Sequence, residues 1–108
     1  MANNYKFKGV ALTTIDETAL LTAASTDTII IRSIRVTNNT ANTPTVSMDL
    51  SDNSASTEYT ILKTQTLSAN TAVEILTVPL VLEASDSLKA TMSSSDSTHI
   101  GISYLVIT

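Results

Sequence analysis

The chain contains one histidine and no cysteine, and these two counts limit its chemistry at the outset. Neither a histidine cluster nor a thiolate metal site can form within one copy, because both need several such ligands. A catalytic His99 would need a nucleophile and an orienting acid nearby, and the sequence has no Gly-x-Ser-x-Gly elbow. We interpret His99 as a surface or turn residue at the start of the last strand. Only three copies of His99 around a common axis could bind a metal ion.

One acidic segment has a partial likeness to a calcium loop. Asp49 and Asp52 precede Asn53 and Ser54, so several oxygen ligands follow one another closely. Calcium-binding loops of this kind also need a glycine at their sharp turn and a bidentate glutamate, and this segment has neither in place. We therefore predict a plain β-turn here.

Two further pairs of acids could be considered for glycoside hydrolysis, which uses paired carboxylates. They are Asp16 with Glu17, and Glu83 with Asp86. No aromatic platform accompanies either pair, so solvated turns are the better interpretation. With only two glycines in the chain, phosphate-cradling loops are excluded too. The sequence therefore predicts no catalytic residue, no cofactor and no metal site, and hence no enzyme.

The basic residues are few. Six Lys and Arg stand against ten Asp and Glu, which gives a net charge of −4 and argues against nucleic-acid binding. Lys6 and Lys8 form the only local basic pair, beside Tyr5 and Phe7, and we expect an ordinary solvated strand face there. We also expect these aromatic rings, like the other tyrosines, to pack between strands.

Arg32 and Arg35 stand three residues apart in the most β-branched segment of the chain. On a regular strand this spacing puts them on opposite faces, so at least one points away from the core. Two interpretations stay open. Arginine is enriched at protein interfaces, so this face could meet a partner. Alternatively, both residues are solvated or form salt bridges at the surface.

The elements that must position these residues are strands. Alternating apolar and polar residues, bounded by Asn-, Asp- and Ser-rich turns, predict strands over residues 5–10, 28–37, 45–50, 57–67, 72–82, 88–92 and 99–107. In the last strand Gly101 and Ser103 share one face and leave room there for close approach. Proline cannot donate to a ladder, so Pro79 marks an edge, a bulge or a break into two short strands.

Two segments depart from simple alternation. Ile29 and Ile31 have one parity, whereas Ile34 and Val36 have the other. A β-bulge near Arg32 would bring both pairs to the same face. Residues 14–21 have capping-box spacing before an apolar stretch, so one short helical turn is an alternative there.

Threonine and serine account for 33 of the 108 residues, while aromatic residues make up only 4%. Threonine keeps β-propensity on an outer strand face while remaining polar. Isoleucine, leucine and valine must then fill a small core, so a marginal monomer that gains stability by self-association is expected. The apolar stretches are far shorter than the roughly 20 residues that span a bilayer, and no secretory signal is recognised. Without secretion, the Asn38–Thr40 glycosylation sequon has no meaning.

Taken together, the pattern predicts an all-β chain that folds as a single antiparallel β-sandwich domain over residues 1–108. We expect a jelly-roll-like sandwich of about seven or eight strands with at most one short helical turn.

The C-terminal third resembles the ending of small bacteriophage virion proteins of about a hundred residues. The resemblance lies in residues 81–91, Val-Leu-Glu-Ala-Ser-Asp-Ser-Leu-Lys-Ala-Thr, and in residues 99–107, His-Ile-Gly-Ile-Ser-Tyr-Leu-Val-Ile. Ser85 stands where those proteins usually have glycine, and Val106 stands where they often have glutamate. Residues 1–9 and 33–38 are similar to marine phage structural proteins, cyanophage-like ones in particular.

This resemblance implies a virion structural protein, either a capsid decoration protein or a tail, collar or spike component. It implies self-association, with a trimer favoured, docking on major capsid, tail or collar proteins, and a virion location after synthesis in the cytoplasm of the host bacterium. Nucleic acid and membrane are not expected partners. The alternative is a carbohydrate- or surface-binding β-sandwich module, which the Asn- and Ser-rich turns at residues 38–43 and 93–97 would suit.

Overall fold

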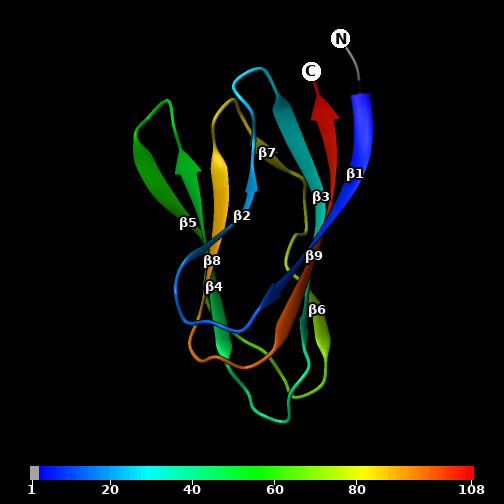
Figure 1. The fold of residues 1–108 in the computed structure, drawn as a ribbon, viewed down its shortest axis with the longest axis vertical. Coiled ribbons are helices and arrows are strands. Elements are labelled where there is room, and N and C mark those ends of the chain that lie inside the picture. The colour runs from blue at the N-terminus through cyan, green and yellow to red at the C-terminus, as the bar shows by residue number, and fades with distance from the viewer. Residues whose placement is uncertain (1–2) are drawn as a thin grey trace.

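A computed structural model describes residues 3–108 and shows two antiparallel sheets packed face to face (Figure 1). The nine strands are β1 (Asn3–Leu12), β2 (Thr18–Thr22), β3 (Thr28–Asn38), β4 (Thr45–Asp52), β5 (Thr57–Thr66), β6 (Ala72–Glu74), β7 (Leu80–Leu82), β8 (Ser87–Met92) and β9 (Thr98–Ile107). Within these residues there is no helix, and so none that could cross a membrane.

The strand order is that of a jelly roll. Sheet A has the order β1-β9-β3-β6, with β7 also paired to β3, and sheet B has the order β2-β8-β4-β5. Sheet B lies on the left of Figure 1 and sheet A on the right, and the chain crosses repeatedly between them. The predicted all-β sandwich is thus confirmed.

The segment with capping-box spacing forms a strand, so the helical alternative is wrong. Leu20 and Leu21 lie in β2, and the pairing of β2 with β8 shifts register between Ala19 and Leu21. This bulge turns both leucines into the core, where they are almost completely buried. Because of the bulge, the consecutive residues Leu20 and Leu21 can both be buried in a strand, as they could be in a helix.

Two predictions about strand irregularities are confirmed. The pairing of β3 with β9 shifts register between Ile31 and Ser33, which is the predicted bulge at Arg32. Pro79 separates two short strands, of which β6 pairs with residues 35–37 of β3 and β7 pairs with residues 29–31. This division, together with β2, explains why nine strands are present instead of seven or eight.

The core between the sheets is aliphatic. Its largest completely buried side chains belong to isoleucine, leucine, methionine and valine: Leu20, Ile31, Ile34, Val36, Val46, Met48, Leu67, Leu82, Leu88, Ile100 and Ile102. Serine and threonine occupy many of the alternate strand positions, which face outward. The hydroxyl-rich composition therefore forms the outer faces and turns, as expected.

Asn38, the first residue of the sequon, is completely buried at the end of β3. Its amide donates to the carbonyl oxygens of Asn42 (2.7 Å), Ser68 (3.2 Å) and Leu67 (3.3 Å). Its side-chain oxygen accepts hydrogen bonds from the N–H and hydroxyl of Thr40. Asn38 thus joins two loops at one end of the sandwich, and its side chain is not accessible to a modifying enzyme in the folded protein.

In a similar way, Asp86 joins the β4–β5 turn to the β7–β8 turn. It is 3% exposed, and its two carboxylate oxygens accept from the N–H groups of Asn53 and Glu83, each at 2.9 Å. The preceding residue, Ser85, has a φ of +68°, in the left-handed region that favours glycine. Glycine adopts this conformation without strain, whereas the Cβ atom of serine disfavours it.

We expect Asn38→Ala to destabilise the fold by about 2–3 kcal/mol, because it leaves buried backbone groups without partners. Urea unfolding followed by circular dichroism would measure this loss. The control is Asn39→Ala, which changes an exposed neighbour and keeps its backbone bond to Ser97. Equal stability of the two variants would contradict the role given to Asn38.

We expect Ser85→Gly to raise the free energy of unfolding by a few tenths to about 1 kcal/mol, because glycine adopts a positive φ without strain. Ser68→Gly is the matched control. Ser68 is exposed and is not among the described residues of positive φ, so glycine there should lower stability. A destabilising effect at both positions in thermal unfolding would disprove this explanation.

Candidate functional site

An apolar row crosses the outer face of sheet A. Tyr5 of β1 lies opposite Leu105 of β9, Leu105 lies opposite Ile30 of β3, and Ile30 lies opposite Val81 of β7. Tyr5 is 74% exposed and Val81 48% exposed, while the two central residues are half-buried. The row spans four strands, and the solvent-facing side of a sheet is normally polar. The apolar row is an exception to this pattern.

At the Tyr5 end of this row, two aromatic rings and an arginine border an open pocket of about 480 Å³. Tyr5, Phe7 and Arg32 line it together with Ser103, Lys6 and Tyr104. We call it the aromatic–arginine pocket.

The sequence predicted that Gly101 and Ser103 leave room for close approach, and the structure confirms this, with Phe7 as the neighbour. A Cβ atom on Gly101 would lie only 3.0 Å from the Phe7 ring, so glycine lets the ring lie close to the sheet.

The expectation that the aromatic rings pack between strands is wrong for most of them. Phe7 is 69% exposed and Tyr59 is 52% exposed, as is Tyr5 in the apolar row. The cause is that β1 and β5 are edge strands. Along residues 3–9 of β1 both sides of the strand are exposed, including Lys6 and Lys8 on the side opposite the rings. Although apolar and charged residues alternate along residues 5–10, neither side of residues 3–9 is buried.

Arg32 and Arg35 are both exposed. Arg35 lies opposite Gly101, on the outer face, and Arg32 reaches the aromatic–arginine pocket on that same face. The expectation that they point to opposite faces is wrong, because the bulge between Ile31 and Ser33 inserts an extra residue and resets the parity. Arg32 takes part in no ion pair among residues 3–108.

Glu74 of β6 stabilises the bulge. Its carboxylate accepts hydrogen bonds from the Ser33 hydroxyl and from the N–H groups of Ile34 (2.8 Å) and Leu76 (3.3 Å). Partial burial is the largest single influence and raises the pKa of Glu74. The hydrogen bonds and the charge of Arg35 together outweigh it, so the pKa lies below 4.5.

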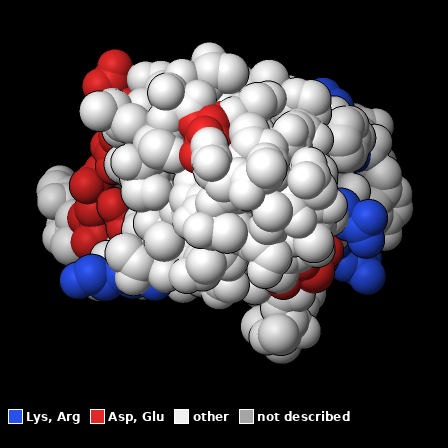
Figure 2. Space-filling view, turned by 90° about the horizontal axis from the view of Figure 1, so that it is seen from below, with Lys and Arg blue, Asp and Glu red and all other residues white. Residues whose placement is uncertain are grey.

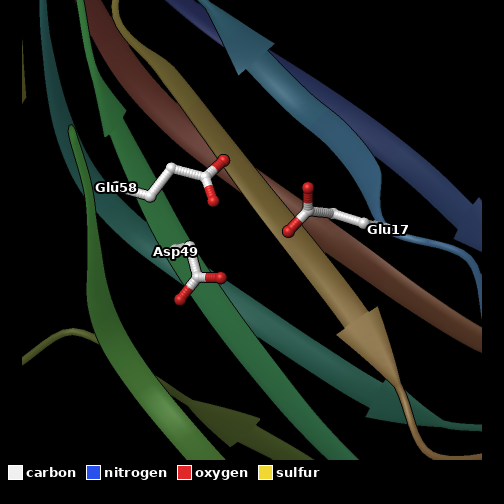
Figure 3. Close-up of side chains that lie close together, drawn as sticks. All are labelled: Glu17, Asp49 and Glu58. Carbon is white, nitrogen blue, oxygen red and sulfur yellow. The ribbon is translucent and has the colours of Figure 1, made fainter. Parts of the chain in front are cut away.

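The outer face of sheet B carries an acidic cluster, made of Glu17 before β2, Asp49 of β4 and Glu58 of β5. Figure 3 shows their carboxylates pointing toward one another, and oxygen atoms of all three lie within 4.8 Å. The ammonium of Lys89 lies 3.0 Å from Glu58 and 3.8 Å from Glu17.

The hydrogen bond to Glu58 and then its charge raise the pKa of Lys89, with smaller effects from Glu17 and Asp49. Three carboxylates around one lysine leave an excess of negative charge. The lysine already provides the cation that such a cluster could otherwise attract.

A second acidic group contains Asp52, Glu83 and Asp86. The structure thus separates the two aspartates that gave this segment its partial likeness to a calcium loop. Asp49 joins the acidic cluster, while Asp52 lies near Glu83 and Asp86 of the β7–β8 turn. Asp52 accepts hydrogen bonds from the Ser54 hydroxyl and from the N–H of Ala55, as expected for a turn. Both oxygens of Asp86 are used by backbone donors. This group holds the turns at one end of the sandwich.

His99 is exposed on sheet A, opposite Ala11 on β1 and Thr37 on β3. Among the described residues, neither group of close acidic ligands includes His99. No described feature gives it a catalytic partner.

Charge is unequally divided between the two sides of the sandwich. In Figure 2 the largest group of acidic atoms lies at the left, the side of sheet B, with a smaller basic group below it. The largest group of basic atoms lies at the right beside a smaller acidic group, and the surface between the two sides is mostly uncharged. Four of the six basic residues belong to β1 and β3 of sheet A: Lys6, Lys8, Arg32 and Arg35. Of these, Arg32 and Arg35 lie on the outer face of sheet A beside the apolar row, whereas the outer face of sheet B carries the acidic cluster and hydroxyl groups.

No model of a known protein family matches the chain, and no curated protein matches it in sequence. Among solved structures, a chain from infectious bursal disease virus, Gx strain, is similar with a TM-score of 0.61 and 12% identity. The match covers 96% of this chain and 32% of the viral chain, so this chain spans about a third of that chain's length.

Two other similar structures come from assembled proteins. A subunit of the Bacillus endospore appendages, described as disulfide-linked pili, matches with a TM-score of 0.56 and 8% identity, over 96% of this chain and 85% of that one. The core of Drosophila NLP, described as forming pentamers and binding histones, matches with a TM-score of 0.53 and 18% identity. This match covers 94% of this chain and 98% of the NLP chain. At these identities the similarity shows the fold alone.

We expect Glu74→Gln to make stability less sensitive to acid. Because the folded-state pKa lies below 4.5, the contribution of Glu74 is fully present above that pH and is lost as the pH falls through the folded-state pKa. Urea unfolding at pH 7 and at acid pH should show a smaller difference for the variant than for the wild type. Glu83→Gln is the control, since the Glu83 carboxylate has no hydrogen bond within residues 3–108. An equal loss of unfolding free energy at acid pH in both variants would contradict the role given to Glu74.

Proposed function

We propose that this chain is a non-enzymatic structural subunit of a virus particle, one that self-associates and docks on other particle proteins. The observation that carries the proposal is the apolar row with its adjoining arginine, exposed on a jelly roll whose own core is already complete. Such a face is stabilised by covering it with another subunit. The fold similarity to chains from a virus, a pilus and a pentamer supports an assembling role.

The finer assignment follows from the resemblance of residues 81–91 and 99–107 to phage virion proteins. It makes the chain a bacteriophage capsid decoration protein or a tail, collar or spike component, favoured as a trimer. Its partners would be further copies of itself and major capsid, tail or collar proteins. It would be made in the cytoplasm of the host bacterium and would function in the virion, without contact to nucleic acid or membrane.

A second candidate is a carbohydrate-binding module, and one observation favours it. Tyr5 and Phe7 present exposed rings beside Arg32 in a pocket of about 480 Å³. Sugars stack on such rings, and the guanidinium could bind a carboxylate or hydroxyl of the sugar. In the Asn- and Ser-rich turn at residues 38–43, which first suggested this function, Asn38 is buried and hydrogen-bonded within the fold. Its side chain is therefore not available to bind a sugar.

We expect light scattering coupled to chromatography to give a mass of three 11.4 kDa chains, with dissociation on dilution. Purified virions should contain the chain by mass spectrometry. A monomer at every concentration, together with absence from virions, would reject the structural assignment. Specific binding on a glycan array by that monomer would establish the second candidate.

A further inference from the structure

We propose that copies of this chain bind head to tail, with the outer face of sheet A in one copy seated on the outer face of sheet B in the next. Arg32 of the first copy would approach the acidic cluster of the second. This inference rests on the proposed self-association and names the surfaces that carry it. The occupant of the apolar row and the aromatic–arginine pocket is therefore a second copy of this chain.

The face of sheet A has the composition of an interface core. Aromatic residues and arginine are enriched where protein surfaces meet, and they carry much of the binding energy. Here Tyr5 and Phe7 are among the most exposed large apolar side chains, and Arg32, which forms no ion pair within residues 3–108, lies beside them. The half-buried Leu105 and Ile30 continue the apolar surface between them and Val81. A partner that covers this face must also offer negative charge to Arg32.

The outer face of sheet B provides that charge. Glu17, Asp49 and Glu58 surround the single Lys89, so the cluster keeps an excess of negative charge. Its members lie on β4, on β5 and just before β2, and Lys89 lies between them on β8. Arginine can bind carboxylates with two parallel hydrogen bonds, so the pairing would also fix orientation.

Hydroxyl groups near the acidic cluster can be covered at little cost. The Ser47 hydroxyl oxygen accepts the Thr64 N–H at 2.9 Å, and the hydroxyls of Thr22 and Ser87 are hydrogen-bonded to each other at 2.9 Å. Burial of a polar group is expensive only when it loses its partner. Because these groups keep their partners within the chain, apolar side chains from a second copy can lie over them.

Symmetric pairings of like faces are electrostatically unfavourable. Two sheet A faces would bring two surfaces together that each carry Arg32 and Arg35. The carboxylate on that face, Glu74, is already engaged by Ser33 and by backbone N–H groups. Two sheet B faces would bring two acidic clusters together. Unlike faces are complementary in charge, and such complementarity selects partners and orientation.

The geometry of the sandwich fits this arrangement. The two outer faces lie on opposite sides of the molecule (Figure 1), so each copy can bind one neighbour through each face. The molecule is 45 Å long and 22 Å across its shortest axis, so a sheet face approaches the roughly 800 Å² per partner of a standard interface. Because the two faces point in opposite directions, successive head-to-tail contacts stack copies into an open filament. A closed trimer needs contact faces that are inclined to one another, so an assembly that stops at three chains would contradict this arrangement while leaving the proposed self-association intact.

The test uses one variant of each face, Arg32→Glu and Glu58→Lys, both at exposed positions. We expect each variant alone to self-associate at least about tenfold more weakly than the wild type, because each has one defective face. Mixed together, the two variants should associate, because the intact sheet A face of Glu58→Lys can bind the intact sheet B face of Arg32→Glu. Sedimentation velocity on the separate and mixed proteins measures this directly.

The controls change net charge by the same amount away from the proposed contact. Lys8→Glu, on the side of β1 opposite the rings, matches Arg32→Glu. Glu83→Lys matches Glu58→Lys, and both controls should assemble like the wild type. Circular dichroism confirms that every variant is folded.

Each other result overturns the inference. If the wild type assembles and Glu58→Lys assembles equally well, sheet B is not part of the contact, although the proposed structural function survives. If the wild type stays monomeric, both proposals fail. If Tyr5→Ser abolishes binding on a glycan array while assembly is unchanged, the pocket holds a saccharide instead.

Discussion

The bulge in β3 is the constraint on which the rest of the structure depends. Ile29 and Ile31 precede it, and Ile34 and Val36 follow it, and all four are buried. On a regular strand the two pairs would face opposite sides, and half of this central strand's apolar surface would be left in water. One extra residue at Arg32 corrects the parity and allows a single strand to supply four residues to the core.

The same bulge determines the chemistry of the outer face. It projects Arg32 over Ser103 at the pocket, and it leaves Arg35 on the outer side as well. It also disturbs the backbone pairing, and the Glu74 carboxylate compensates by accepting the hydroxyl of Ser33 and the N–H of Ile34. The Glu74 carboxylate, which could have neutralised the arginines, is thus partly engaged in hydrogen bonds to the bulge. Core packing and the basic character of sheet A have one physical origin.

Much of the fold could be predicted because its signals are local. The parity change in residues 29–36 requires a bulge, and Pro79 cannot donate to a ladder, so both irregularities follow from short segments. The β2 strand was not predicted, since Leu20-Leu21 has no strand alternation and depends on a bulge that β8 imposes from a distance. Asn38 was interpreted as a turn residue for the same reason. Its partners at residues 67 and 68 are brought near only by the fold.

The candidate surfaces depend on long-range placement even more strongly. Glu17, Asp49 and Glu58 come from three segments, and no spacing rule relates them. The aromatic residues are the most informative case, because burial of an aromatic ring is a large stabilising contribution. This chain has only four, yet Tyr5, Phe7 and Tyr59 are largely exposed and only Tyr104 packs partly against the core. A fold that fills its core with aliphatic side chains while holding rings on an edge strand gains little stability from them as a monomer. A second surface that covers β1 would bury these rings and increase their contribution, in agreement with the proposed role of this face in assembly.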